Sequence, residues 1–391
     1  MICFGAGQKG NLYEKQSAKR NKENRDRKVS MYMENKKAVK QKTMTLKPGT
    51  TGHEILFLLK EYGYYAETKL QDLIPYKKPD TIRKVVRLLE ISGYITRKKG
   101  MDGSVILALS KLGKEMLQIK ENFMVNTPQK LSRMANLSMV TMMFHRSIPT
   151  IQRTENRKET FYQSKQEIIK EVPGCEKVLT ASRLAGVYHH YGMILPVFKL
   201  GNTMFWMDNA ERQVREYLEE RIFHAKLNRA IFFVETYKKE AVKFLYQDEN
   251  MRKNIGKSLR DSLELSSCYE KVFLFGTDQT GIQQLKLFRS IAHIEEMFLE
   301  AVFEKDQLAS TPDSIVDGYI DDVKCIVLFT GDIVQIKKIC RMLDAGMLEK
   351  IHIFCYDFQE PFLRVAFSAW AERVLYNSYT LEELKTVFHL E

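Results

Sequence analysis

The chain has 391 residues, of which 44% are hydrophobic and 11% aromatic, and this is enough for two or three packed domains. Its 61 Lys and Arg exceed its 49 Asp and Glu, so the formal net charge is +12. No apolar run approaches the roughly 20 residues of a membrane-spanning helix, and no signal-peptide core follows the start, which excludes a membrane protein and predicts a cytoplasmic location.

The positive charge is concentrated in residues 1–47, which contain 13 Lys and Arg but four Asp and Glu. A segment this basic, without apolar periodicity, is expected to be a disordered tail. Beside a DNA-binding domain it would add salt-dependent contacts to phosphate that do not depend on base sequence. The alternative is a solvated tail that only aids solubility.

Residues 50–125 predict a winged helix-turn-helix domain. Three helical segments come first, followed by two strands that are joined by a turn at residues 100–103. Helix, helix, helix, hairpin is the element order of this fold, in which the third helix enters the major groove and the hairpin lies along the DNA backbone. In order, the segments are HEILFLLKEYG (53–63), AETKLQDLIP (66–75), TIRKVVRLLEISG (81–93), YITRKK (94–99) and SVILALS (104–110).

The third helix has an apolar stripe and a basic face. Its apolar residues recur at helical spacing and predict one buried side, formed by Ile82, Val85, Val86 and Leu89. Asp80 or Thr81 is expected to cap its start, after Pro79, and Gly93 to follow its end.

Six basic residues are therefore the predicted DNA contacts. Three lie on the outer face of the third helix and three come directly before the hairpin turn, where phosphate would be met: Arg83, Lys84, Arg87, Arg97, Lys98 and Lys99. The alternatives are a solvated basic face on an ordinary helical domain, or a winged helix that is used only for protein contacts.

Residues 126–178 are predicted to be a helical connector and linker. Apolar residues, four of them methionines, fall at helical spacing between residues 131 and 147, and this enrichment in methionine is typical of an adaptable packing surface. Such a helix would join two domains or contact a second subunit. The following segment, 149–174, is polar and irregular, and we interpret it as a linker or a peripheral excursion.

Residues 179–391 predict an α/β domain. A strand hairpin turns near residues 190–192, and a long helix is expected at 207–227. Short apolar runs then alternate with amphipathic helices, which favours one largely parallel sheet that is covered on both faces. The hairpin and the segments 356–363 and 373–380 would make its edges mixed. The strand segments are AIFFVE (230–235), KVFLFGT (271–277), CIVLFTG (325–331) and IHIFCYD (351–357).

The strand ends of an α/β sheet are where ligands usually bind. The segment from Gly276 to Gly281 resembles a phosphate loop but lacks the Lys-Ser/Thr that such a loop requires. Asp332 is expected to cap the next helix. His189 and His190 are consecutive strand residues that point to opposite faces, so they do not predict a shared metal ion.

A nuclease of the restriction-endonuclease type would need acidic residues and a lysine around a divalent metal. Asp208, Glu235 and Lys238 are the nearest set, although Glu-x-x-Lys is not the usual Glu-x-Lys and Asp208 equally suits a helix cap. The six cysteines are scattered without metal-ligand spacing, so we expect reduced thiols and neither a disulfide nor a zinc site. The sequence therefore predicts no cofactor, no metal and no defined enzyme.

Several phrases of the chain resemble the replication-relaxation family, which is encoded on bacterial plasmids and conjugative elements. They are SVILALSKLGKEML (104–117), the methionine-rich connector, SRLAGVYHHYGMILPVFKLGNTMFWM (182–207) and DFQEPFLR (357–364). The resemblance implies binding of element DNA near an origin of transfer or replication, in support of a relaxase or a replication initiator. Some members carry an α/β domain thought to be nuclease-like, and this chain departs from an active nuclease pattern.

The leading hypothesis is therefore a non-enzymatic accessory protein that binds double-stranded DNA through a winged helix. Because one winged helix contacts few base pairs, we expect a homodimer on a two-fold or repeated site. A transcriptional repressor of the element and a metal-dependent nicking enzyme are the alternatives.

Overall fold

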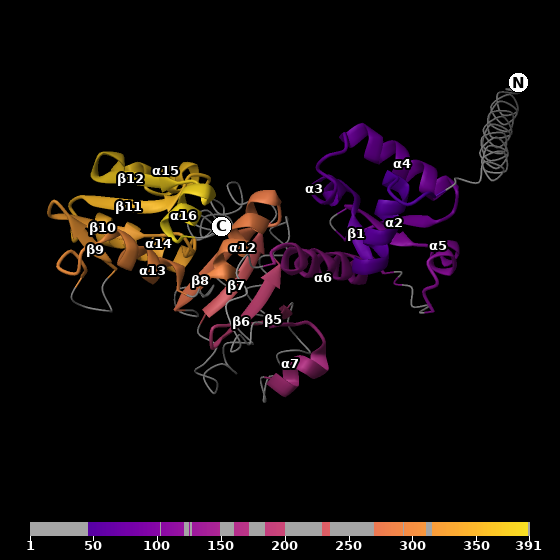
Figure 1. Cartoon of the computed structure of the whole chain (residues 1–391), viewed down its shortest axis with the longest axis horizontal. Helices are drawn as coiled ribbons and strands as arrows, with labels where there is room; N and C mark the ends of the chain where they lie inside the picture. Colours follow the sequence, from indigo (N-terminus) through magenta and orange to yellow (C-terminus); the bar gives the residue numbers. More distant parts are fainter. Residues whose placement is uncertain are drawn as a thin grey trace, which may run out of the picture. The chain divides into compact units, whose positions relative to one another are not determined.

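The computed structural model describes residues 46–101, 103–120, 125, 127–148, 160–171, 184–199, 229–234, 270–291, 293–309 and 315–389. These residues form a mixed α/β structure whose strands belong to three sheets (Figure 1). The chain divides into two compact units, Met1–Ser132 and Arg133–Glu391, which are called unit 1 and unit 2 below.

Unit 1 contains the helices and strands that the sequence predicts between residues 50 and 117, in the predicted order. Its helices are α2 (Thr51–Tyr62), α3 (Leu70–Leu73), α4 (Pro79–Ile91) and α5 (Lys111–Met116), with a 3-10 turn η1 (Glu67–Lys69) before α3. The hairpin strands are β2 (Ile95–Lys99) and β3 (Val105–Leu109). A further strand, β1 (Tyr64–Ala66), was not predicted, and it pairs antiparallel with β3 to give the order β1-β3-β2.

Helix α4 buries one side and ends as predicted, but it begins earlier. Ile82, Val86 and Leu89 are buried, whereas Val85 is half-buried. The helix starts at Pro79, and Lys78 at the cap position makes no side-chain bond, so the predicted cap at Asp80 or Thr81 is wrong. Proline suits the first helical position because its fixed φ is helical and its missing N–H would have no intrahelical partner.

The methionine-rich segment forms helix α6 (Pro128–Arg146), and the boundary between the two units lies within it. Its part in unit 2 is buried at Met139, Met142 and Met143. The ring of Phe144 stacks on Phe161 at a centroid distance of 4.2 Å. This end of the helix is therefore a packed part of unit 2.

Unit 2 opens with a five-stranded mixed sheet, in the order β4-β5-β6-β7-β8. The predicted hairpin is confirmed as an antiparallel pair that turns at Tyr191 and Gly192, while β6, β7 and β8 run parallel. The segment interpreted as irregular linker contains β4 and helix α7 (Lys165–Glu171), so that interpretation is wrong for residues 160–171. The strands are β4 (Thr160–Tyr162), β5 (Leu184–His190), β6 (Met193–Lys199), β7 (Arg229–Val234) and β8 (Lys271–Gly276).

A second mixed sheet has the order β12-β11-β10-β9, so the prediction of one continuous sheet is wrong. Strand β10 cannot pair with β8 because β11 and β9 occupy its two edges. The segment 373–380 supplies the edge strand β12, which is parallel, and 356–363 forms a turn and the start of a helix instead of a strand. The strands are β9 (Gly318–Ile320), β10 (Val323–Val327), β11 (Ile351–Tyr356) and β12 (Val374–Tyr379).

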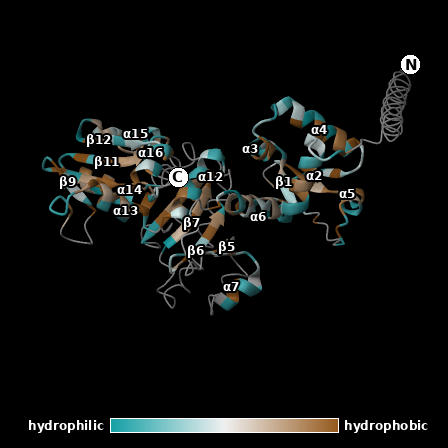
Figure 2. Cartoon of the chain, viewed as in Figure 1, coloured by the Kyte–Doolittle hydropathy of each residue, from teal (hydrophilic) through white to brown (hydrophobic). Residues whose placement is uncertain are grey.

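Helices alternate with these strands and cover them. Strands of both sheets share one hydrophobic core, to which Leu274, Ile326, Ile339 and Ile353 belong, and β11 is coloured largely hydrophobic in Figure 2. Cys325 and Cys355 are fully buried in this region as free thiols, as expected. The helices are α12 (Gln279–Ser290), α13 (Ile294–Val302), α14 (Ile333–Asp344), α15 (Glu360–Ala366) and α16 (Leu381–Val387), with a 3-10 segment η3 (Ser368–Arg373).

Candidate nucleic-acid interface and a polar cluster in unit 2

The three basic residues predicted on the third helix share one exposed face of α4. Because Ile82, Val86 and Leu89 turn toward the core, Arg83, Lys84 and Arg87 are left in solvent. Arg83 lies 2.8 Å from Asp80, and both side chains are more than two thirds exposed. An exposed pair of this kind contributes little free energy, so the guanidinium of Arg83 can exchange this partner for another anion.

The hairpin residue Arg97 forms ion pairs with two carboxylates of unit 1. Its Nε and Nη2 donate to Oε2 of Glu67 at 2.9 and 2.7 Å. Its Nη1 lies 3.5 Å from Oε2 of Glu90, on α4. The hydrogen bond with Glu67 raises the pKa of Arg97 above its usual value. Arg97 therefore ties the hairpin to η1 and α4, and its charge is already compensated.

The other two hairpin residues lie on opposite faces of β2. Lys98 turns away from Arg97, and its Nζ donates to the backbone carbonyl of Val125 at 3.1 Å. The Val125 N–H in turn donates to the Tyr64 hydroxyl at 2.9 Å. Lys99 shares the face of Arg97 and is exposed. The three predicted hairpin contacts are therefore not gathered on one free surface.

The segment before α4 adds exposed groups that the sequence analysis missed. Tyr76 is 66% exposed, and Nζ of Lys77 lies 5.3 Å from the centroid of its ring. Lys78 is exposed at the cap position of α4. Their position between the second and third helices could have identified them from the sequence. The residues just before a groove-binding helix lie close to the DNA.

The possible nuclease residues Asp208, Glu235 and Lys238 lie outside the described residues. Among the residues that are described, no group of three or more His, Cys, Asp or Glu is arranged to hold a metal ion. His189 contacts the ring of Tyr162, whereas His190 stacks on Phe288, so the two rings occupy different faces as predicted.

The segment that resembles a phosphate loop is explained by helix packing. The carboxylate of Asp278 accepts from the N–H of Gly281 at 2.9 Å and caps α12. A Cβ at Gly281 would lie 1.9 Å from the carbonyl oxygen of Gly276, so glycine is required where α12 leaves β8. Asp332 caps α14 as predicted, through the N–H of Val334 at 2.9 Å.

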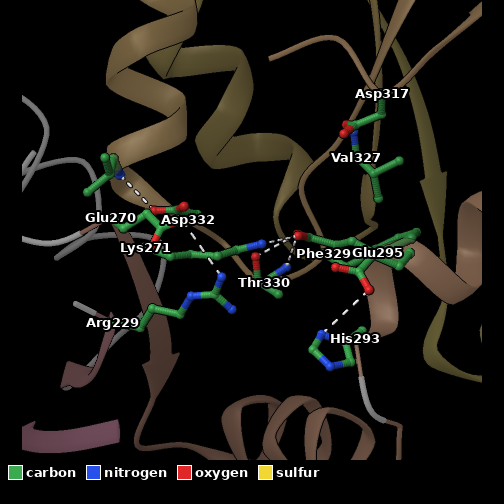
Figure 3. A network of polar contacts seen from close by, with 12 residues as sticks. Arg229, Glu270, Lys271, His293, Glu295, Asp317, Val327, Phe329, Thr330 and Asp332 are labelled. Atoms are coloured by element: carbon green, nitrogen blue, oxygen red, sulfur yellow. Dashed lines mark hydrogen bonds and ion pairs between the residues drawn. The ribbon is translucent and has the colours of Figure 1, made fainter. Parts of the chain in front are cut away.

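A cluster of charged groups in unit 2 was not predicted (Figure 3). Nζ of Lys271, at the start of β8, lies 2.5 Å from Oε2 of Glu295 on α13. The other carboxylate oxygen of Glu295 accepts from the N–H and the hydroxyl of Thr330, at 3.0 and 2.5 Å. Asp332 accepts a second backbone bond, from Val272 at 3.0 Å. The cluster thus joins β8, α13 and the connection after β10.

Two aspartates of this region have strongly raised pKa values. Burial raises the pKa of Asp317 to about 7, against the opposing hydrogen bond from the N–H of Val327 at 2.7 Å. Burial likewise raises the pKa of Asp332 to about 6, against the attraction of Lys271. Carboxylates whose pKa is raised toward neutral pH are a feature of functional sites, and ion-pair networks also produce them.

Comparison with known proteins gives no relative for this chain. No family model, no curated protein and no solved structure matches it. Among the described residues, no helix has the length and apolar character that a membrane span requires.

Proposed function

We propose that this protein binds duplex DNA through unit 1, folded as a winged helix, with α4 in the major groove. The observation that carries the proposal is the division of α4 into a buried stripe and an exposed basic face formed by Arg83, Lys84 and Arg87. Guanidinium and ammonium groups on one side of a helix suit both base edges and phosphates. Exposed Tyr76 and Lys78 extend this face toward the start of the helix.

In this proposal the three basic residues of the hairpin contribute unequally to phosphate binding. Lys99 meets phosphate directly because its side chain is exposed. Arg97 and Lys98 can reach phosphate only by leaving Glu67 and the Val125 carbonyl, so they mainly hold the hairpin in place.

The biological role that we propose is that of a non-enzymatic accessory protein of a plasmid or conjugative element, which assists replication initiation or relaxase-mediated mobilisation. It depends on the resemblance to the replication-relaxation family and on DNA binding. A homodimer on a repeated site would compensate for the small footprint of one winged helix. A repressor of the element would use the same surface on a different DNA site.

The experiment is a binding titration of labelled duplex DNA at several salt concentrations. The test variant is Lys84→Ala/Arg87→Ala. The control is Lys338→Ala/Lys350→Ala, which removes two positive charges from exposed positions of unit 2. We expect the test variant to bind all duplexes more weakly and to flatten the dependence of log K on log salt by about 2. The control should behave as the wild type.

Equal affinity and equal salt dependence for the two variants would overturn the proposal. Recovery of bound DNA from cells then separates the two biological roles. Enrichment of an origin of transfer or replication supports the accessory role, whereas enrichment of a promoter alone supports a repressor.

A further inference from the structure

Unit 2 contains a cleft of about 520 Å³ whose lining combines charged and apolar groups. A volume of this size lies within the range of small-molecule sites. The polar part of the lining includes Arg229, Lys271, His293, Glu295, Glu300 and Asp317, most of which Figure 3 shows. The cleft lies within unit 2 and is independent of the DNA-binding face that is proposed for unit 1.

Three basic groups of the cleft lie near a carboxylate. Lys271 lies 2.5 Å from Glu295. Arg229 lies 3.8 Å from Glu270. His293 lies 3.5 Å from Glu296. An anionic ligand would have to compete with a carboxylate for Lys271 and for Arg229.

Two carboxylates of the lining form no ion pair among the described residues. Among the described residues, neither Asp317 nor Glu300 forms an ion pair, and the hydrogen bond that Asp317 accepts comes from the backbone of Val327. The cleft therefore has an excess of negative charge, although the whole chain carries +12. Desolvation by burial destabilises the charged form of Asp317. A cation beside this carboxylate would stabilise the charged form in place of the missing water.

Much of the remaining lining is apolar and suits the aliphatic chain of a small ligand. Phe273 and Phe288 contribute from β8 and α12, Leu299 from α13, and Leu308 and Val316 from the connection before β9. Apolar walls with a few placed polar groups are the usual composition of a small-molecule site.

We propose that this cleft binds a small organic cation, an ammonium or guanidinium on a short aliphatic chain, with its charged end at Asp317, in a lining to which Glu300 adds a second carboxylate. A divalent metal ion is disfavoured because the described residues bring no three suitable ligands together. A phosphate or a carboxylate is disfavoured because Lys271 and Arg229 are already paired with carboxylates.

The test is calorimetric titration of the full-length protein with agmatine and putrescine, using 1,4-butanediol, succinate, inorganic phosphate and magnesium chloride as comparison probes. The variants are Asp317→Asn and Glu300→Gln, with Glu372→Gln as the control for an exposed carboxylate of η3 outside the cleft. Circular dichroism and thermal unfolding establish that each variant is folded.

We expect one of the two amines to bind with a dissociation constant below about 1 mM and the diol not to bind. Asp317→Asn should weaken amine binding on the order of tenfold in titrations above pH 7, since it removes the negative charge that Asp317 carries there. Glu300→Gln should weaken it less because this side chain is exposed, and Glu372→Gln should leave it unchanged. Absence of amine binding, tighter binding of succinate, phosphate or magnesium, or unchanged affinity in a folded Asp317→Asn variant would each overturn the proposal.

Discussion

Asp317 and Asp332 give unit 2 a dependence on pH that can be worked out from their environments. Burial raises their pKa values to about 7 and about 6, whereas an aspartate in an unfolded chain titrates near 3.9. The folded state therefore binds more protons between about pH 4 and pH 7, and its free energy of unfolding falls as pH rises through that interval. The contribution of these two groups to stability is present in full below about pH 4 and is lost as pH rises above about 7.

We accordingly predict that Asp317→Asn removes part of this dependence. Between pH 5 and pH 8 the wild type should lose more thermal stability than the variant, by about 2–4 °C for each kcal/mol of the difference. Thermal unfolding followed by circular dichroism at both pH values measures the effect. A wild type that loses no more stability than the variant as pH rises would contradict the assignment of Asp317.

At the scale of single elements, Gly281 fixes how closely α12 approaches the end of β8. A methyl group there would lie 1.9 Å from the Gly276 carbonyl oxygen, which belongs to the backbone and cannot turn aside. We predict that Gly281→Ala lowers the free energy of unfolding by roughly 3 kcal/mol. Gly346→Ala is the control, because a methyl group at Gly346 meets open space and costs about 1 kcal/mol through its positive φ of 72°. Urea titration measures both, and equal losses would refute the packing argument.

Arg97 connects three elements of unit 1, and its importance can be measured separately from DNA binding. It joins β2 to η1 through Glu67 and to α4 through Glu90. We predict a coupling free energy of about 0.5–1 kcal/mol between Arg97→Ala and Glu67→Ala in a double-mutant cycle, since the pair is partly exposed. The cycle uses urea titration of the four proteins. Additive losses would mean that the ion pair does not hold the hairpin.

These elements also show how far the sequence predicts the structure. The stripe of Ile82, Val86 and Leu89 predicted α4 because a helix with one buried side has a period that is visible in the chain. Strands β1, β4 and β9 were missed because three residues are too few to show the alternation of a strand. Their positions depend on pairing with distant segments, and so does the division of unit 2 into two sheets.

The polar cluster was missed for a related reason. Lys271, Glu295 and Thr330 come from three elements that are far apart in the chain, and each has an ordinary local context. Asp332 was predicted as a helix cap, which is correct, but its second bond to Val272 arises only from the packing of β8 beside α14. Candidate sites of this kind can be identified only from the three-dimensional structure, because their residues are distant in the sequence.

At the scale of the whole molecule, we expect the basic residues 1–47 to contribute to affinity for any DNA, and α4 to contribute to the choice of DNA sequence. Residues 1–47 contain 13 basic residues, and replacing these by Gln would lower the formal net charge from +12 to −1. If the proposed DNA binding is correct, this variant should bind every duplex more weakly and show a flatter salt dependence, because phosphate contacts carry no sequence information. Arg83→Ala should instead cost roughly 1–3 kcal/mol on a selected site and little on random DNA.

The control for the tail is a variant in which the sequence of residues 1–47 is shuffled without changing its composition. Since contacts between a basic segment and phosphate depend on charge and not on residue order, the shuffled variant should bind as the wild type does. Salt-dependent titrations of a selected duplex and a random duplex measure all four proteins. Loss of affinity in the shuffled variant would show that this segment recognises DNA through a defined sequence, and equal losses on both duplexes in Arg83→Ala would remove α4 as the element that reads bases.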